Sequence, residues 1–89
     1  MYTDKAVAEL QDYIEKAIKE ENLFLMLDCL GNVGYYRGVL KEDSSKMRLD
    51  DFIQYVRNFQ MGDPVYFCPI YSLKDLDRAK DEFVIEPWF

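Results

Sequence analysis

Residues 23–40 read LFLMLDCLGNVGYYRGVL, and this stretch decides the fold. Its first half is apolar except for Asp28, and after Gly31-Asn32 a second run rich in valine and tyrosine follows. Two runs of β-forming residues joined by a Gly-Asn pair are typical of a β-hairpin. The expected strands are residues 23–30 and 33–40.

The length of the turn sets which residues of the hairpin face each other. A two-residue turn at Gly31-Asn32 would place Asp28 opposite Tyr35, with Arg37 diagonal to Asp28. A shift of one residue would exchange the two faces, because side chains alternate along a strand. We therefore expect Asp28, Tyr35 and Arg37 to share the outer face of the hairpin.

The two faces of this hairpin differ in polarity. One is mainly apolar and should meet the helices, with Gly34 and Gly38 allowing a helix to approach the sheet closely. Its other residues are Leu23, Leu25, Leu27, Cys29, Tyr36 and Leu40. The outer face would hold Phe24, Met26, Asp28, Leu30, Val33, Tyr35, Arg37 and Val39.

Apolar residues at helical spacing predict three helices. The first covers residues 4–21, with Asn22 as a left-handed stop. The second begins at Asp50 as its N-cap and is ended by Gly62 and Pro64. The third follows Ser72, which opens a capping-box pattern. The residues expected to face the core are Val7, Leu10, Ile14, Ala17, Ile18, Phe52, Ile53, Val56, Phe59, Leu73, Leu76, Ala79 and Phe83.

Three further extended segments complete the predicted sheet. Residues 47–49 are a candidate short strand, residues 65–71 a strand, and residues 84–89 an extended end. Pro69 inside the second segment favours an edge strand or a bulge, because proline cannot donate to a ladder. The order α-β-β-(β)-α-β-α-β predicts a single small α+β domain over residues 1–89. We expect a mostly antiparallel sheet of three to five strands, with two to three helices packed on one face.

The residue types present exclude most catalytic and metal chemistry. The 89 residues include no histidine and only two cysteines, which are too far apart to form a CxxC pair. The commonest general base and metal ligand is therefore missing, and a structural zinc site is not expected. Neighbouring carboxylates within helices point apart and make no catalytic dyad. We expect a non-enzymatic protein without cofactor or metal, in which Cys29 and Cys68 are buried free thiols.

The charge and the hydropathy of the chain limit the classes of partner that we expect it to bind. Seventeen acidic against eleven basic residues give a net charge of −6, which disfavours direct binding of nucleic acid, because phosphate contacts are made by lysine and arginine. A spanning helix needs about 20 consecutive apolar residues, and the sequence has no such run. We expect a cytoplasmic protein that does not bind membranes.

Aromatic residues make up 16% of the chain and favour a protein interface. The sequence ends on Pro87-Trp88-Phe89, whose rings either dock on their own sheet, the reading we prefer, or insert into a partner. The expected core rings are Phe52, Phe59, Phe67 and Phe83. The expected surface rings are Tyr2, Tyr35, Tyr55, Tyr66, Tyr71 and Trp88.

These features together predict a protein-binding module. We expect an inhibitor or adaptor that occupies a surface of a larger protein, one that is basic and nucleic-acid-binding if the carboxylates mimic phosphates. In size and composition the chain is similar to many small phage and mobile-element proteins that antagonise host machinery. The alternative is a homodimer that binds a small ligand such as a nucleotide. The expected binding residues are Asp28, Tyr35, Arg37, Trp88 and Phe89.

Overall fold

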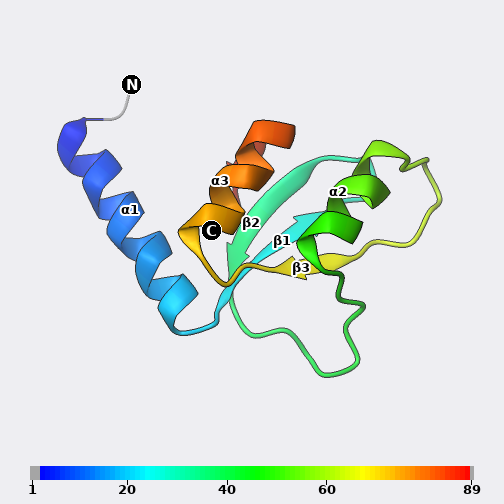
Figure 1. The fold of residues 1–89 in the computed structure, drawn as a ribbon, viewed down its shortest axis with the longest axis horizontal. Coiled ribbons are helices and arrows are strands. Elements are labelled where there is room, and N and C mark those ends of the chain that lie inside the picture. Colours follow the sequence, from blue (N-terminus) through cyan, green and yellow to red (C-terminus); the bar gives the residue numbers. More distant parts are fainter. Residues whose placement is uncertain (1–2, 89) are drawn as a thin grey trace.

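Three helices and four strands make up the computed structural model, which describes residues 3–88 (Figure 1). In chain order they are α1 (Asp4–Lys19), β1 (Leu23–Leu27), β2 (Val33–Arg37), α2 (Leu49–Arg57), β3 (Phe67–Pro69), α3 (Leu73–Glu82) and β4 (Ile85–Pro87). Tyr2 and Phe89, two of the aromatic candidates, lie outside the described residues. None of the described helices has the length and hydropathy needed to cross a membrane.

The strands form one mixed sheet in the order β3-β1-β2-β4. β1 is antiparallel to both β2 and β3, whereas β4 runs parallel to β2. The predicted α+β class and mostly antiparallel sheet are therefore confirmed. The expected edge position of Pro69 is also confirmed, because β3 forms one margin of the sheet. The candidate strand 47–49 is wrong, since only a single parallel bridge joins Lys46 to Phe67.

The pairing of β1 with β2 differs from the prediction. Leu27 lies opposite Val33 and Leu25 opposite Tyr35, so the loop between the strands spans residues 28–32 rather than two residues. The register is shifted by an odd number of residues, which exchanges the faces of β2 while leaving those of β1 as expected. Val33 and Tyr35 consequently point into the core, and Tyr36 lies on the other face.

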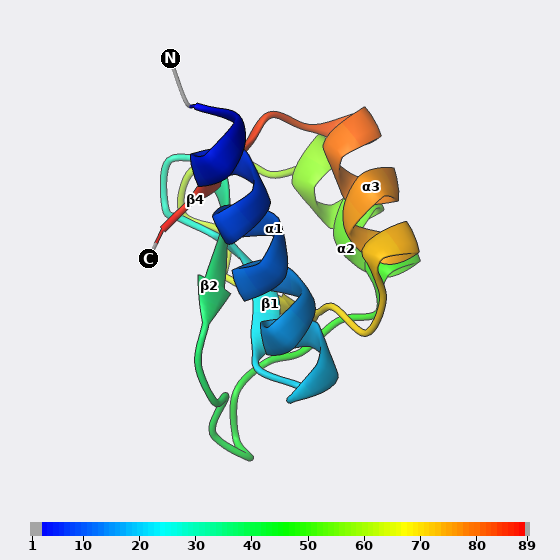
Figure 2. The same cartoon turned by 90° about the vertical axis from the view of Figure 1, so that its left-hand side faces the viewer.

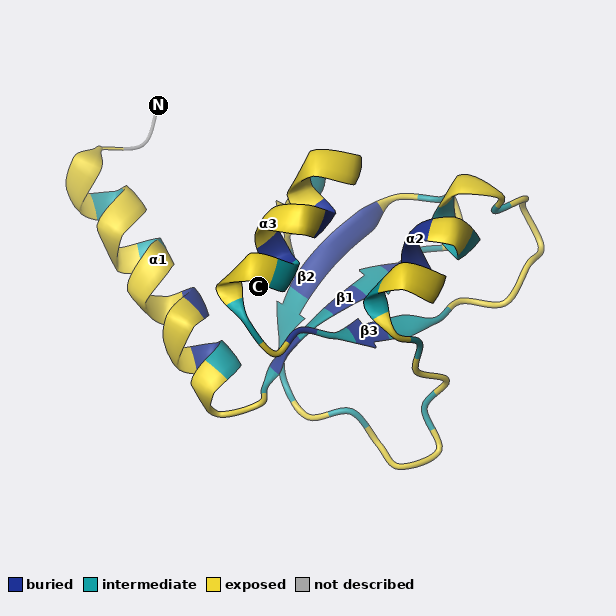
Figure 3. Ribbon diagram, viewed as in Figure 1, coloured by how far each residue is buried: buried dark blue, intermediate teal, exposed yellow. Residues whose placement is uncertain are grey.

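All three helices contribute to a core on one face of the sheet (Figures 2 and 3). Figure 2 shows α2 and α3 on one side of β2, and no described helix on the opposite side. The buried hydrophobic residues are Ile14, Ala17, Leu23, Leu25, Leu27, Val33, Tyr35, Phe52, Ile53, Cys68, Ile70, Leu76 and Ala79.

Several residues predicted to face the core are less buried than expected. Phe59, Phe83 and Val56 are half-buried at its margin, while Val7 and Leu73 are exposed. The first turns of α1 extend beyond the sheet, which explains why only its last half contributes buried residues (Figure 3).

The helix ends confirm some of the predicted caps and correct others. Ser72 caps α3, because its hydroxyl accepts the backbone N–H of Asp75 at 3.2 Å, as expected. The prediction that Asp50 caps α2 is wrong: Arg48 is the N-cap residue and Asp50 lies in the first turn. The left-handed residue after α1 is Glu21 (φ 59°) and not Asn22. It completes a Schellman motif, in which Asn22 N–H bonds to Ala17 O and Glu21 N–H to Ile18 O.

Candidate functional site

The face of the sheet opposite the helices carries two rows of residues that run across the strands. A single parallel bridge joins Lys46 to Phe67, and ladder pairing joins Phe67 to Met26, Met26 to Gly34, and Gly34 to Glu86. Residues paired in a bridge or a ladder project from the same face of a sheet. We call this row the charged rung, because it has a lysine at one end and a glutamate at the other.

The second row is aromatic. Pro69 pairs with Phe24, and Phe24 pairs with Tyr36. Trp88 follows β4 and extends the row beside Tyr36, since the Trp88 N–H bonds to Tyr35 O at 3.0 Å. We call Pro69, Phe24, Tyr36 and Trp88 the aromatic rung, and the two rungs together the open face.

Rings on the open face contact one another across the strands. Phe24 stacks on Tyr36 at 5.5 Å between ring centroids, and Phe67 and Trp88 meet these two rings edge-on, each at 5.7 Å. All four rings are half-buried, although no helix among the described residues covers them. This cluster of four rings is the largest aromatic cluster formed by the described side chains, and it makes the open face the candidate site.

Gly34 is the place where the end of the chain docks. A Cβ atom at this position would overlap the indole ring of Trp88, at Cδ2, Cε2 and Cε3. The expectation that Gly34 and Gly38 admit a helix is therefore wrong, because Gly34 admits Trp88 on the opposite face. The preferred reading of the terminal aromatics, docking on their own sheet, is confirmed for Trp88.

Asp28 shapes the hairpin loop. Its carboxylate accepts the backbone N–H of Asn32 at 2.8 Å and of Leu30 at 2.9 Å, and the side-chain amide of Asn32 at 3.2 Å. These hydrogen bonds, that from the Asn32 backbone foremost, hold the pKa of Asp28 below its usual value. Asp28 thus closes the five-residue loop, and the predicted pairing with Tyr35 and Arg37 does not form.

Arg37 lies at the other end of the hairpin and joins β2 to α1. Its guanidinium lies 2.7 Å from the carboxylate of Glu20 and 4.6 Å from the ring centroid of Tyr13. The hydrogen bond to Glu20, followed by that to Tyr13, raises the pKa of Arg37. This arrangement gives Arg37 a structural contact within the chain and places it on the helix side.

Tyr35 is only 3% exposed and belongs to the core, so its prediction as a surface residue is wrong. The structure therefore separates the predicted binding residues that it describes, and among these Trp88 is the one on the open face. Sequence reasoning assigned Phe24 and Met26 correctly to the outer face. It missed Tyr36, Phe67, Lys46 and Glu86, which only the strand order and register bring together.

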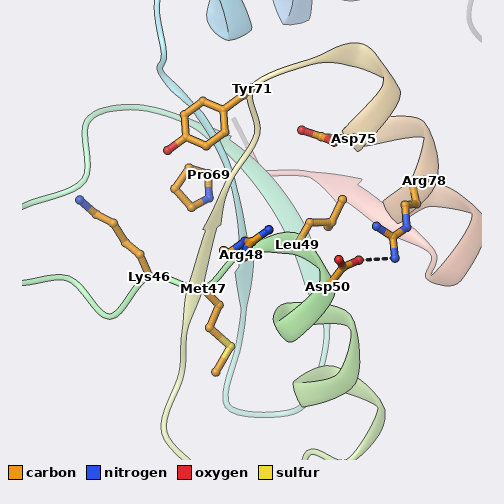
Figure 4. A pocket seen from close by; sticks show the side chains of 9 residues that line it. All are labelled: Lys46, Met47, Arg48, Leu49, Asp50, Pro69, Tyr71, Asp75 and Arg78. Atoms are coloured by element: carbon orange, nitrogen blue, oxygen red, sulfur yellow. Dashed lines mark ion pairs between the residues drawn. The ribbon is translucent and has the colours of Figure 1, made fainter.

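A hollow of about 400 Å³ lies at the start of α2 and beside β3 (Figure 4). Arg48, Asp75 and the ion pair between Asp50 and Arg78 surround it, and Tyr71 stands at its rim with 66% of its surface exposed. Three bases, Lys46, Arg48 and Arg78, and two acids, Asp50 and Asp75, line this hollow, so it offers no surface of one sign to a charged ligand.

The cysteines differ in environment. Both are free, as predicted, but Cys29 is exposed in the hairpin loop, which corrects the expectation that it is buried. Burial raises the pKa of the Cys68 thiol to about 12, which keeps it protonated and unreactive. No group of three or more potential metal ligands occurs within residues 3–88.

Comparison with known proteins gives no relative: no family model, no curated protein and no solved structure matches this chain.

Proposed function

We propose that this protein is a non-enzymatic protein-binding module whose open face is the docking surface. The observation that carries the proposal is the cluster of four contacting rings on a sheet face that none of the described helices covers. Aromatic side chains and methionine are enriched at protein interfaces, where they supply rigid contact area. By occupying a surface of its partner, such a module acts as an adaptor or an inhibitor.

The charge on the open face favours a protein partner over single-stranded nucleic acid. Stacking platforms for bases combine aromatic rings with a basic groove that follows the phosphates. Here Lys46 is the one base among the residues of the two rungs, and Glu86 balances it. An apolar centre with one charge at each end is typical of a contact between proteins.

The edge strands favour binding of a partner on the open face rather than along an edge of the sheet. Pro69 lies in the edge strand β3 and Pro87 in the edge strand β4. Proline cannot donate a ladder hydrogen bond, and proteins use it at edges to prevent strand addition. A partner is therefore better accommodated on the face than along either margin.

Phosphate mimicry receives less support than apolar docking. The acids do not concentrate on one element: α1 carries four acids and three bases, and α3 carries the same numbers. Mixed signs along a helix are typical of a solvated surface. The proposal therefore places recognition on the rings and leaves to the carboxylates a role in solubility.

Capture from an extract of the native host tests this proposal. Wild type is compared with Met26→Glu, which puts a charge at the centre of the open face, and with Gln54→Glu, which adds the same charge to exposed α2. A tagged and an untagged copy are present together, so that self-association is also detected. We expect wild type and Gln54→Glu to retain the same partner and Met26→Glu to lose it. Equal capture by all three proteins, with circular dichroism confirming the fold, would contradict the proposal.

A further inference from the structure

We infer that the partner of the open face is a second copy of this chain, an inference that rests on the proposed function. Its basis is the order of residues along the charged rung. From one margin to the other these are Lys46, Phe67, Met26, Gly34 and Glu86. The rung is antisymmetric in charge about its middle residue, Met26.

A two-fold axis parallel to β1 converts this antisymmetry into complementarity. Rotation by 180° about such an axis places the open faces of two copies against each other. The strand order of the second copy then runs opposite to that of the first, and each rung lies over the same rung of the other copy. Lys46 then lies over Glu86 of the second copy, and Glu86 over Lys46 of the second copy. Met26 meets Met26 of the second copy at the centre. Closed dimers of this kind use the same patch on both copies, so each ion pair forms twice.

The aromatic rung fits the same operation. Phe24 lies on β1, so the axis brings it against Phe24 of the second copy, while Pro69 faces Tyr36 of the second copy. Phe67 in the charged rung faces Gly34 of the second copy, where the docked indole of Trp88 supplies an aromatic surface. Every apolar position thus meets another apolar or aromatic surface, and the two sheets pack as an aligned pair.

The size of the face predicts how strong the dimer is. Five positions separated by about 4.8 Å make a rung about 20 Å wide. A sheet face with two rungs is smaller than the ~800 Å² per partner of a typical stable complex. We therefore expect a dimer whose population depends on protein concentration within the micromolar to millimolar range.

Charge reversal on purified protein tests the dimer. Sedimentation equilibrium is measured from about 10 µM to about 1 mM, where interfaces of this size associate. Lys46→Glu and Glu86→Lys each turn both ion pairs into repulsive contacts, and each should weaken dimerisation by roughly three- to thirtyfold. The double variant Lys46→Glu/Glu86→Lys restores opposite charges and should recover wild-type association. Lys74→Glu, exposed on α3, changes the net charge as Lys46→Glu does and should leave dimerisation unchanged.

The outcomes separate the two proposals. Dimerisation that follows this pattern, and is lost in Met26→Glu, supports the second copy as partner. A double variant as weak as the single variants, or a dimer that persists in Met26→Glu, overturns it. Wild type that stays monomeric but captures a different protein through the open face refutes the dimer and leaves the proposed function standing. Wild type that stays monomeric and captures no other protein contradicts both the dimer and the proposed function.

Discussion

The indole ring of Trp88 lies against the backbone of Gly34, at a position where no Cβ atom fits. Trp88 is the only tryptophan in the sequence, and its backbone N–H bonds to Tyr35 O. One glycine in β2 therefore determines whether the segment after β4 can pack on the open face, and with it whether the aromatic rung is complete.

Replacing Gly34 by alanine should displace this ring. We expect Gly34→Ala to shift the tryptophan fluorescence to longer wavelength and to lower the free energy of unfolding by about 1–3 kcal/mol, because the added methyl group forces the ring out of its site. Gly38→Ala is the matched control, since a Cβ at that position makes only an ordinary 3.8 Å contact with Phe24. An unchanged emission spectrum in Gly34→Ala would show that Trp88 does not occupy this site in solution.

The left-handed residue after α1 predicts a substitution that stabilises the protein, whereas Gly34→Ala destabilises it. Glu21 has φ 59°, a conformation that favours glycine over residues with a Cβ. We expect Glu21→Gly to raise the free energy of unfolding by about 0.5–1 kcal/mol, because the relief of strain exceeds the added entropy of the unfolded chain. A glycine at exposed Lys16, inside the helix, should lower it by about 0.5–1 kcal/mol. Urea denaturation of both variants measures the difference, and destabilisation by both would mean that Glu21 is not left-handed in solution.

The hairpin shows how far the sequence could predict this fold. Leucines alternate with Phe24 and Met26, and this alternation was sufficient to assign the two faces of β1. In β2 two tyrosines are adjacent, so hydrophobicity could not decide between Tyr35 and Tyr36 for the core. The length of the hairpin loop decides which tyrosine is buried. The carboxylate of Asp28 organises a loop of five residues, whereas the Gly-Asn pair had indicated a loop of two.

The candidate site could not be predicted from the sequence, because it depends on pairing between segments that are far apart in the chain. Lys46, Phe67 and Glu86 belong to separate segments that are brought level only by the strand order β3-β1-β2-β4. No local pattern carries that order, since it results from how the helices cover one face and from the parallel return of β4. The excess of aromatic residues did predict an interface, but it could not locate the rings on one face.

The two cysteines should react at very different rates. Cys29 is exposed, whereas Cys68 is buried and its pKa is raised to about 12. With a thiol reagent at neutral pH we expect one equivalent to react rapidly and the second only when the protein unfolds. Cys29→Ser should abolish the fast phase and leave the slow one. Two fast thiols, or none under denaturing and non-reducing conditions, would contradict the structure.

Asp28 predicts how stability depends on pH. Its hydrogen bonds lower the pKa in the folded protein, so the folded state favours the carboxylate more than the unfolded state does. The stabilisation is therefore fully present above the unfolded pKa, near 3.8, and is lost as the pH falls through the lower folded pKa. Asp28→Asn keeps the shape of the side chain but carries no charge at any pH.

We accordingly expect wild type to be more stable than Asp28→Asn at pH 7, with the difference shrinking as the pH falls below about 4. Urea denaturation across this range measures the difference directly. Asp43→Asn, which removes an exposed carboxylate from the loop before α2, controls for the change in net charge. A difference in the free energy of unfolding that stays constant down to the lowest pH measured would show that the hydrogen bonds of Asp28 do not depend on its charge. A difference that widens toward low pH would reverse the sign of the predicted pKa shift, and with it the role of this carboxylate in closing the hairpin loop.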